Sequence, residues 1–176
     1  MERLIKSIRD SLSSGNYIAA ITLAVTLPDI CGNIEWPNCK KSKKRYVRWC
    51  RKNLESTYCV KVEKTNPLVL KMGIPFTQGV DGRYELKFLE SLCLYQLRCA
   101  LLHSGRSKLS KCKQNERIYD EFEFVDDSKM RWCVKLNPKT NKTTACFDTQ
   151  LFCENICKAV ELWLKDHPTN LGLKIQ

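Results

Sequence analysis

Two side chains that could cleave RNA lie five residues apart in one apolar stretch, residues 94–105. Arg98 interrupts this stretch, and His103 is one of only two histidines in the 176-residue chain. A planar guanidinium can hold a phosphate and stabilise the negative charge that develops on it. An imidazole, whose ordinary pKa is about 6.5, can accept a proton from a ribose 2′-hydroxyl. The pair is therefore a candidate for acid–base chemistry on RNA.

The spacing of the pair matters as much as its chemistry. Five residues of an α-helix turn the chain by about 500°, so Arg98 and His103 would point about 140° apart. Gly105 fits the position at which a helix ends in the left-handed conformation, and we expect this ending to let the two side chains converge. The alternative is that Arg98 and His103 have no catalytic role. Arg98 could cap the helix or pair with Glu90 or Asp29, and His103 could be an ordinary surface residue.

The segment Arg98-Cys99-Ala100-Leu101-Leu102-His103 resembles the R-x(4–6)-H motif of the HEPN superfamily. The resemblance implies a four- or five-helix bundle and, in many members, a metal-independent endoribonuclease. It assigns catalysis to Arg98 and His103, and we add Tyr95 and Ser104 as candidate supporting groups. It also implies a homodimer with a composite cleft and products that carry a 2′,3′-cyclic phosphate and a 5′-hydroxyl. HEPN nucleases often have Asn, Asp or His after the arginine, where this chain has Cys99.

The charge of the chain favours an anionic partner. The formal net charge is +11, and residues 40–52 hold eight basic residues and no acidic one. Helical spacing within this run predicts a basic stripe that suits the phosphate backbone of RNA, although a charge run is often only a solvated face. The stripe consists of Lys41, Lys44, Arg45, Arg48 and Lys52.

Apolar periodicity predicts a mainly α fold. We expect helices over residues 2–13, 17–27 with an extension toward 34, 42–53, 83–104 and 149–166. Residues 55–82 read as a loop with short pieces of structure. Alternation and turn residues predict antiparallel strands near residues 118–125, 130–136 and 143–147. The expected architecture is a single HEPN-like domain over residues 1–176, with the bundle at about 2–105 and 148–166 and a small antiparallel β insertion at about 117–147.

Cofactors and membranes are not indicated. Eleven cysteines are best explained as free, mostly buried thiols, since their spacing matches no zinc site. Cys153 and Cys157 lie one helical turn apart but lack a second pair of ligands. No secretory signal or long apolar run is evident, so we expect a cytoplasmic protein without a membrane span, a metal or another cofactor.

Three functions remain open from the sequence. The first is an HEPN-type endoribonuclease, which the family resemblance connects with toxins or phage defence, and whose partners would be RNA, a second copy and an antitoxin or regulatory protein. The second is a non-catalytic HEPN-like module that binds RNA, a nucleotide or a protein. The third is a basic DNA-binding or scaffold protein in which the motif is accidental.

Overall fold

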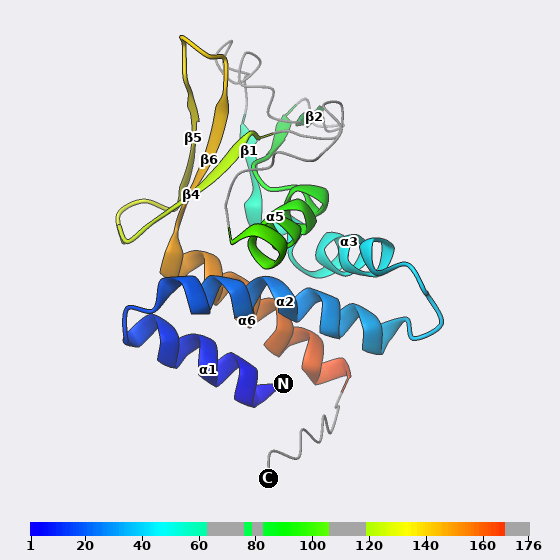
Figure 1. Ribbon diagram of the computed structural model, residues 1–176. Coiled ribbons are helices and arrows are strands. Elements are labelled where there is room, and N and C mark those ends of the chain that lie inside the picture. The colour runs from blue at the N-terminus through cyan, green and yellow to red at the C-terminus, as the bar shows by residue number, and fades with distance from the viewer. Residues whose placement is uncertain (63–75, 79–82, 106–118, 168–176) are drawn as a thin grey trace.

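The computed structural model describes residues 1–62, 76–78, 83–105 and 119–167, and its main features are helical (Figure 1). The mainly α class is therefore confirmed. The described α-helices are α1 (Glu2–Ser13), α2 (Tyr17–Glu35), α3 (Ser42–Asn53), α5 (Ser91–Ser104) and α6 (Thr149–Asp166), and a short 3-10 helix, η1, spans Glu55–Tyr58. The bounds of α1, α3 and α6 are those that the sequence predicts.

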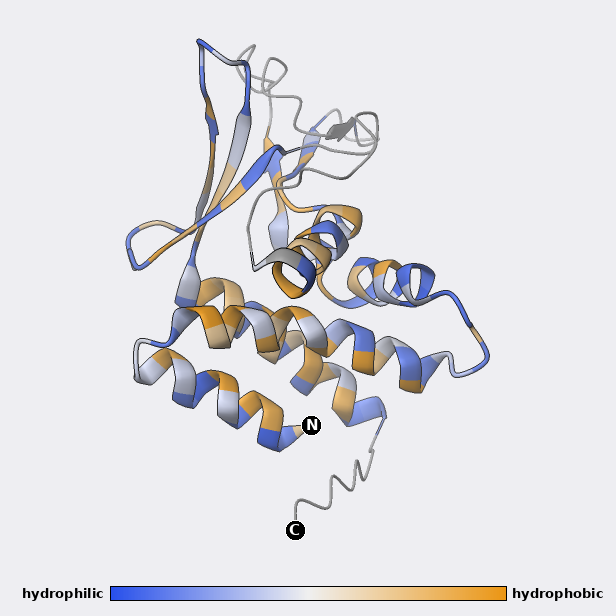
Figure 2. Cartoon of the chain, viewed as in Figure 1, coloured by the Kyte–Doolittle hydropathy of each residue, from blue (hydrophilic) through white to orange (hydrophobic). Residues whose placement is uncertain are grey.

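Helix α2 is the centre of the fold. It packs against α1, α3, α5 and α6, and Figure 1 shows it between α1 on one side and α3 and α5 on the other. Most of α2 is apolar, as its colouring in Figure 2 shows. The side chain of Asn16 caps its start by accepting from the Ala19 N–H. By length and composition, α2 alone among the described helices could cross a membrane, but its four neighbours are those of a core helix.

Proline does not end α2, contrary to the shorter of the two lengths expected for this helix. Pro28 lies buried inside the helix, where its ring removes one backbone N–H from the hydrogen-bond ladder. The neighbouring helix supplies a donor nearby, because the Tyr46 hydroxyl donates to the Val25 carbonyl at 2.9 Å. Contacts with α3 thus stabilise the segment that leads to Asp29.

Polar side-chain contacts join helices that are far apart in the sequence. Arg9 of α1 donates to Glu154 at 2.9 Å and to Glu161 at 2.7 Å, both on α6. Glu35, the last residue of α2, accepts from Lys52 of α3 at 2.8 Å and from the indole N–H of Trp163 of α6 at 2.9 Å. These contacts join α1 to α6 and fix the C-terminal end of α2 relative to α3 and α6.

Two three-stranded sheets lie on the same side of α2 as α5 (Figure 1). The first is antiparallel, in the order β1-β3-β2, and the second has the order β4-β6-β5. Aromatic rings connect the second sheet to α6, with the Phe124 and Phe152 centroids 5.0 Å apart. The strand bounds are β1 (Cys59–Val62), β2 (Phe76–Gln78), β3 (Tyr84–Lys87), β4 (Glu121–Val125), β5 (Trp132–Leu136) and β6 (Thr143–Asp148).

The prediction of an antiparallel β insertion is wrong for one of its two pairings. β5 and β6 are antiparallel, but β4 runs parallel to β6, with Glu121 opposite Thr144 and Val125 opposite Asp148. Residue alternation along a strand indicates which face is buried, but it does not indicate which strand becomes the neighbour. β4 therefore skips β5 and lies at the edge of a mixed sheet.

The expected helix over residues 83–104 is too long at its start. Tyr84–Lys87 forms β3, and α5 begins only at Ser91. The expected loop over residues 55–82 also contains η1, β1 and β2. Strands of three or four residues are too short for alternation to separate them from a helical pattern. Residues 63–75 and 79–82 of that loop lie outside the described residues, as does Cys112.

Candidate functional site

Helix α5 carries both residues of the HEPN-like motif. It ends as predicted, with Gly105 in the left-handed conformation at φ +59° and its N–H bonded to the Leu101 carbonyl at 2.9 Å. The helix nevertheless runs through Ser104, so Arg98 and His103 belong to the same regular helix. Their directions differ by about 140°, and the expected convergence within one chain is wrong. Gly105 ends the helix only after both residues, so it cannot bring them together.

Arg98 lies in the contact between α2, α3 and α5. Its Nη2 donates to Oδ2 of Asp29 at 2.6 Å. Asp29 is one of the two ion-pair partners that we considered for Arg98 if its role is structural. The guanidinium carbon also lies 5.7 Å from the ring centroid of Tyr46. The Arg98 side chain is 18% exposed and that of Asp29 is 24% exposed. Asp29 therefore fixes and largely neutralises the guanidinium, which reaches solvent along only one side.

The Asp29–Arg98 pair is not fully satisfied within the described residues. Nε of Arg98 and Oδ1 of Asp29 are both buried and have no hydrogen-bond partner there. Burial of charged groups with incomplete hydrogen bonding costs free energy. The arrangement thus places a guanidinium with unused donor capacity at the junction of three helices.

His103 lies on another face of α5 and is exposed. Helical spacing puts Tyr95, Cys99 and His103 on one stripe, because residues four apart are neighbours on a helix surface. Burial raises the pKa of Tyr95, and a hydrogen bond with Cys99 raises it further. The Tyr95 ring also contacts Tyr46 edge-on, with centroids 5.5 Å apart. Tyr95 thus lies between the stripe that carries His103 and the Tyr46 ring that Arg98 also contacts. The side chain of Ser104 lies outside the described part of the chain.

The basic stripe of α3 is only partly as predicted. Lys41, Lys44 and Arg48 are exposed, and the Arg48 guanidinium lies 4.3 Å from the centroid of the Trp36 ring. Arg51, which the prediction omitted, is 74% exposed and belongs to the same surface. The sequence spacing could have placed Arg51 on this surface, because positions 44, 48 and 51 share a helix face. We define the basic face of α3 as Lys41, Lys44, Arg48 and Arg51.

The other two members of the predicted stripe are engaged by neighbouring elements. Arg45 turns inward, donates from Nη1 to the Cys39 carbonyl, and lies against Gly32 of α2. Lys52 pairs with Glu35 at 2.8 Å. Both residues lie at the edge of α3 that faces α2. The sequence shows that they are basic, but not that a second helix approaches on that side.

The basic face and the motif lie on adjacent helices. α3 packs against α5, and Figure 1 shows the two side by side above α2. Among the described residues, no group of three or more His, Cys, Asp or Glu side chains gathers closely enough to hold a metal ion. Helices α3 and α5 together carry exposed cations, an exposed imidazole and a partly buried guanidinium.

Comparisons with known proteins add no relative. No family model matches the chain, and neither the curated proteins nor the solved structures contain a match. The likeness to HEPN proteins consequently rests on the motif residues alone.

Proposed function

We propose that this protein is a cytoplasmic RNA-binding endoribonuclease that acts without a metal ion. The observation that supports the proposal is the adjacency of α3 and α5. The basic face of α3 suits an RNA backbone, and α5 beside it carries Arg98 and His103. Toxin activity or phage defence, with a regulatory protein as a further partner, belongs to the same proposal through the HEPN resemblance.

His103 and Arg98 would divide the chemistry between them. His103 would take the proton from the ribose 2′-hydroxyl, and the 2′-oxygen would attack the adjacent phosphorus. The bond to the 5′-oxygen breaks, and that oxygen takes a proton from the imidazolium. The Arg98 guanidinium would stabilise the additional negative charge on the phosphoryl oxygens. The products would be a 2′,3′-cyclic phosphate and a 5′-hydroxyl.

The geometry of a single chain requires a second chain for this chemistry. Because Arg98 and His103 point about 140° apart on α5, one phosphate cannot contact both from the same helix. A two-fold dimer would solve the problem, since Arg98 of one protomer could meet His103 of the other. We therefore include a homodimer with two composite sites in the proposal.

A second candidate function has an observation of its own. The Asp29 carboxylate holds Arg98 inside the chain, as it would hold an arginine with a purely structural role. A non-catalytic RNA-binding module would keep the basic face of α3 and use α5 only for packing. This candidate predicts RNA binding that is independent of both Arg98 and His103.

Cleavage in EDTA separates the two candidates. Wild type, Arg98→Ala and His103→Ala are incubated with a labelled RNA, and the product ends are identified. We expect cleavage by wild type and its loss in both variants, with RNA binding retained. His167→Ala is the matched control, because the second histidine packs against Trp163 on α6 and should be dispensable. RNA binding without cleavage by any of the proteins would support the non-catalytic module instead.

A mixing experiment tests the composite site. Arg98→Ala and His103→Ala subunits, each inactive alone, are unfolded and refolded together. Random pairing makes about half of the dimers mixed, and each mixed dimer has one intact composite site. We expect about a quarter of wild-type activity. A mixture as inactive as its components would refute the exchange of residues between protomers.

A further inference from the structure

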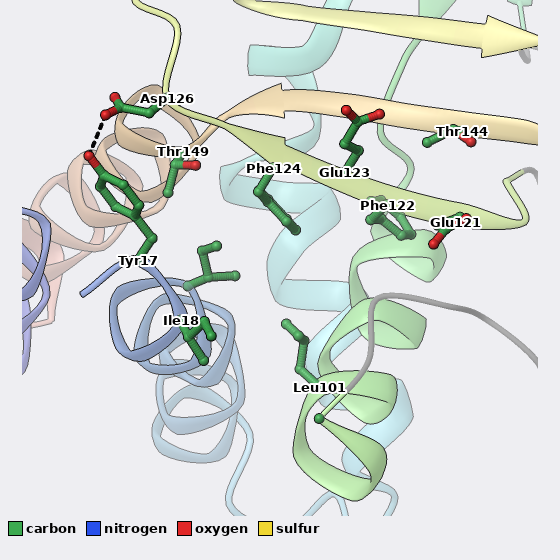
Figure 3. Close-up of a pocket in the computed structure, with 12 residues that line it drawn as sticks. Tyr17, Ile18, Leu101, Glu121, Phe122, Glu123, Phe124, Asp126, Thr144 and Thr149 are labelled. Carbon is green, nitrogen blue, oxygen red and sulfur yellow. Dashed lines mark hydrogen bonds between the residues drawn. The ribbon is translucent and has the colours of Figure 1, made fainter. Parts of the chain in front are cut away.

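A groove with acidic sides lies on another face of α5, between α5, the start of α2 and the edge strand β4. Its volume is about 540 Å³, within the range of roughly 300–1,000 Å³ that is usual for binding pockets. Figure 3 shows Ile18 of α2 and Leu101 of α5 on its lower side and strand β4 above them. The apolar lining consists of Ile18, Ile21, Leu101, Phe122 and Phe124.

The apolar part of the groove includes a side chain that the fold leaves uncovered. Ile18 is 80% exposed, the highest value among the large apolar residues of the described chain. It lies in the first turn of α2, where a polar residue would cost nothing in packing. Ile18 thus adds exposed apolar surface to the edge of the groove.

Hydrogen bonds hold the walls of this groove in place. The Tyr17 hydroxyl at the start of α2 donates to Oδ2 of Asp126 at 2.5 Å, as the dashed line in Figure 3 marks. At the end of β4, the Thr149 hydroxyl donates to the Val125 carbonyl at 2.8 Å. The groove is therefore preformed, and an occupant would not have to order its walls.

Strand β4 gives the groove a backbone that can pair. It lies at the edge of its sheet, with β6 on one side and no described strand on the other. An edge strand presents N–H and C=O groups that an added strand can bond. Addition of an extended segment to such an edge is a common mode of peptide recognition.

The acidic lining of the groove favours a segment that carries positive charge. Glu121, Glu123 and Asp126 line the groove, although the chain as a whole carries a net charge of +11. Lys135 offsets one of them by pairing with Glu123 at 2.8 Å, but none of the residues that line the groove is basic, so no lining residue offsets Glu121 or Asp126. A cationic segment would gain from these carboxylates locally while the rest of the protein repels it.

We propose that this groove binds an extended, basic segment of a partner protein, which adds to β4 as a further strand. Alternate side chains of the segment would point to opposite sides, so its apolar residues would contact Ile18 and Leu101 and its lysines or arginines would meet the glutamates. This inference does not depend on catalysis at Arg98 and His103. It assigns the surface to a protein, whereas the basic face of α3 suits RNA.

Peptide binding tests the proposal directly. The probe is a fluorescently labelled nine-residue peptide that alternates lysine and valine, and binding to the full chain is followed by anisotropy. The controls are the glutamate–valine peptide and a lysine–valine peptide whose backbone amides are methylated on one edge. We expect the unmodified basic peptide to bind at least about tenfold more tightly than either control.

Two matched variants locate the site. Ile18→Gln changes the exposed groove residue without adding charge, and Leu162→Gln changes another exposed apolar residue, 61% exposed, on α6. Leu162 lies about 20 Å along α6 from the lining residue Thr149. We expect Ile18→Gln and Glu121→Lys each to weaken peptide binding by about tenfold or more and Leu162→Gln to leave it unchanged. Both exposed positions should tolerate substitution without loss of the fold.

Three outcomes would overturn the proposal. Equal binding of the basic and acidic peptides would remove the role of charge. Equal binding of the methylated peptide would exclude strand addition to β4. Absence of peptide binding would also overturn it, and a dimer that Ile18→Gln dissociates would then show that the groove receives a second copy of this chain. The first two results do not bear on RNA cleavage, and the third bears only on which face forms the dimer, so the inference and the nuclease proposal can fail separately.

Discussion

The basic face of α3 and the acidic groove beside β4 both border α5, but they are built in different ways. Four cations of the basic face come from one helix and its first flanking residue, and they project into solvent. The groove takes its lining from α2, α5, β4, β6 and α6. A single helix offers charge with little shape, which suits a uniform phosphate chain. Several elements together offer shape, an apolar floor and a backbone edge, which suit a polypeptide.

This contrast also explains how the chain can carry a net charge of +11 and still present an acidic surface. The acidic residues of β4 alternate with phenylalanines, so the strand that buries Phe122 also holds Glu121 and Glu123 near the groove. The two surfaces should therefore respond to different substitutions.

The largest effect should follow from breaking the Asp29–Arg98 pair, which joins α2 to the helix that both surfaces border. Asp29→Ala leaves a guanidinium that is only 18% exposed without its carboxylate. Loss of one partner of a fully buried pair costs roughly 3–5 kcal/mol, and the partial exposure here reduces this to about 2 kcal/mol. Urea unfolding of the variant measures the change.

The double variant Asp29→Ala with Arg98→Met provides the control for that experiment. An apolar side chain of similar length removes the stranded charge, so we expect most of the lost stability to return. A double variant as unstable as Asp29→Ala alone would show that the loss comes from the packing of Asp29 and not from the ion pair.

RNA affinity should distinguish the two surfaces clearly. Lys44→Ala with Arg48→Ala should weaken RNA binding by about tenfold at moderate salt. The slope of log affinity against log salt concentration should become less steep by about two. Binding of the basic peptide should be unchanged, and Glu121→Lys should give the opposite pattern. Lys6→Ala is a matched control, since Lys6 is an exposed cation of α1 that pairs with Asp10. Equal losses in the control would mean that net charge alone governs binding.

The position of the basic face depends on the close approach of α3 to α2 at Gly32. A Cβ there would lie 3.1 Å from the backbone oxygen of Arg45 and 3.3 Å from its Cβ. Gly32→Ala gains up to about 1 kcal/mol of helix propensity, but overpacking costs about 1–3 kcal/mol, so we expect a net loss of about 1 kcal/mol. Thermal unfolding measures it. Asn33→Ala, at the exposed neighbouring position, isolates the propensity gain, and a stabilised Gly32→Ala would contradict the steric account.

The smallest effect concerns thiol reactivity. Burial raises the pKa values of Cys31, Cys146 and Cys157 to about 12, so these thiols should stay protonated and unreactive at pH 8. Among the described thiols, the half-buried Cys39, Cys99 and Cys133 should react first with a thiol reagent. Because Cys99 lies on the His103 face of α5, RNA should slow its modification and the basic peptide should not. Equal protection by both ligands would show that the two surfaces overlap.

The same raised pKa values predict a loss of stability at high pH. A thiol whose pKa is higher in the folded chain than its ordinary value of about 8.5 binds its proton more tightly there. Its contribution to stability is complete below about pH 8.5 and is lost as the pH rises toward 12. Urea unfolding between pH 8 and 10 should show declining stability, and Cys146→Ala should make the decline less steep.

The sequence predicts features that depend on neighbours along the chain. The bounds of α1, α3 and α6 follow from apolar spacing and turn residues, and the left-handed end of α5 follows from Gly105. Features that depend on a partner element were missed or left open. The parallel β4–β6 pair, the inward turn of Arg45 and the capture of Lys52 by Glu35 all need the position of a second element. Asp29 was foreseen as one partner of Arg98, but only the packing of α2 against α5 decides between it and Glu90.

The central place of α2 has a consequence for synthesis on the ribosome. Its apolar surface is covered in part by α6, whose first residue follows the end of α2 by 114 residues. At roughly 5–20 residues per second, α6 emerges roughly 6–23 seconds after α2. During that interval the most apolar helix of the chain lacks one of its covering partners. We therefore expect the nascent chain to depend on chaperones, and nonsense truncations before α6 to yield degraded or aggregated fragments.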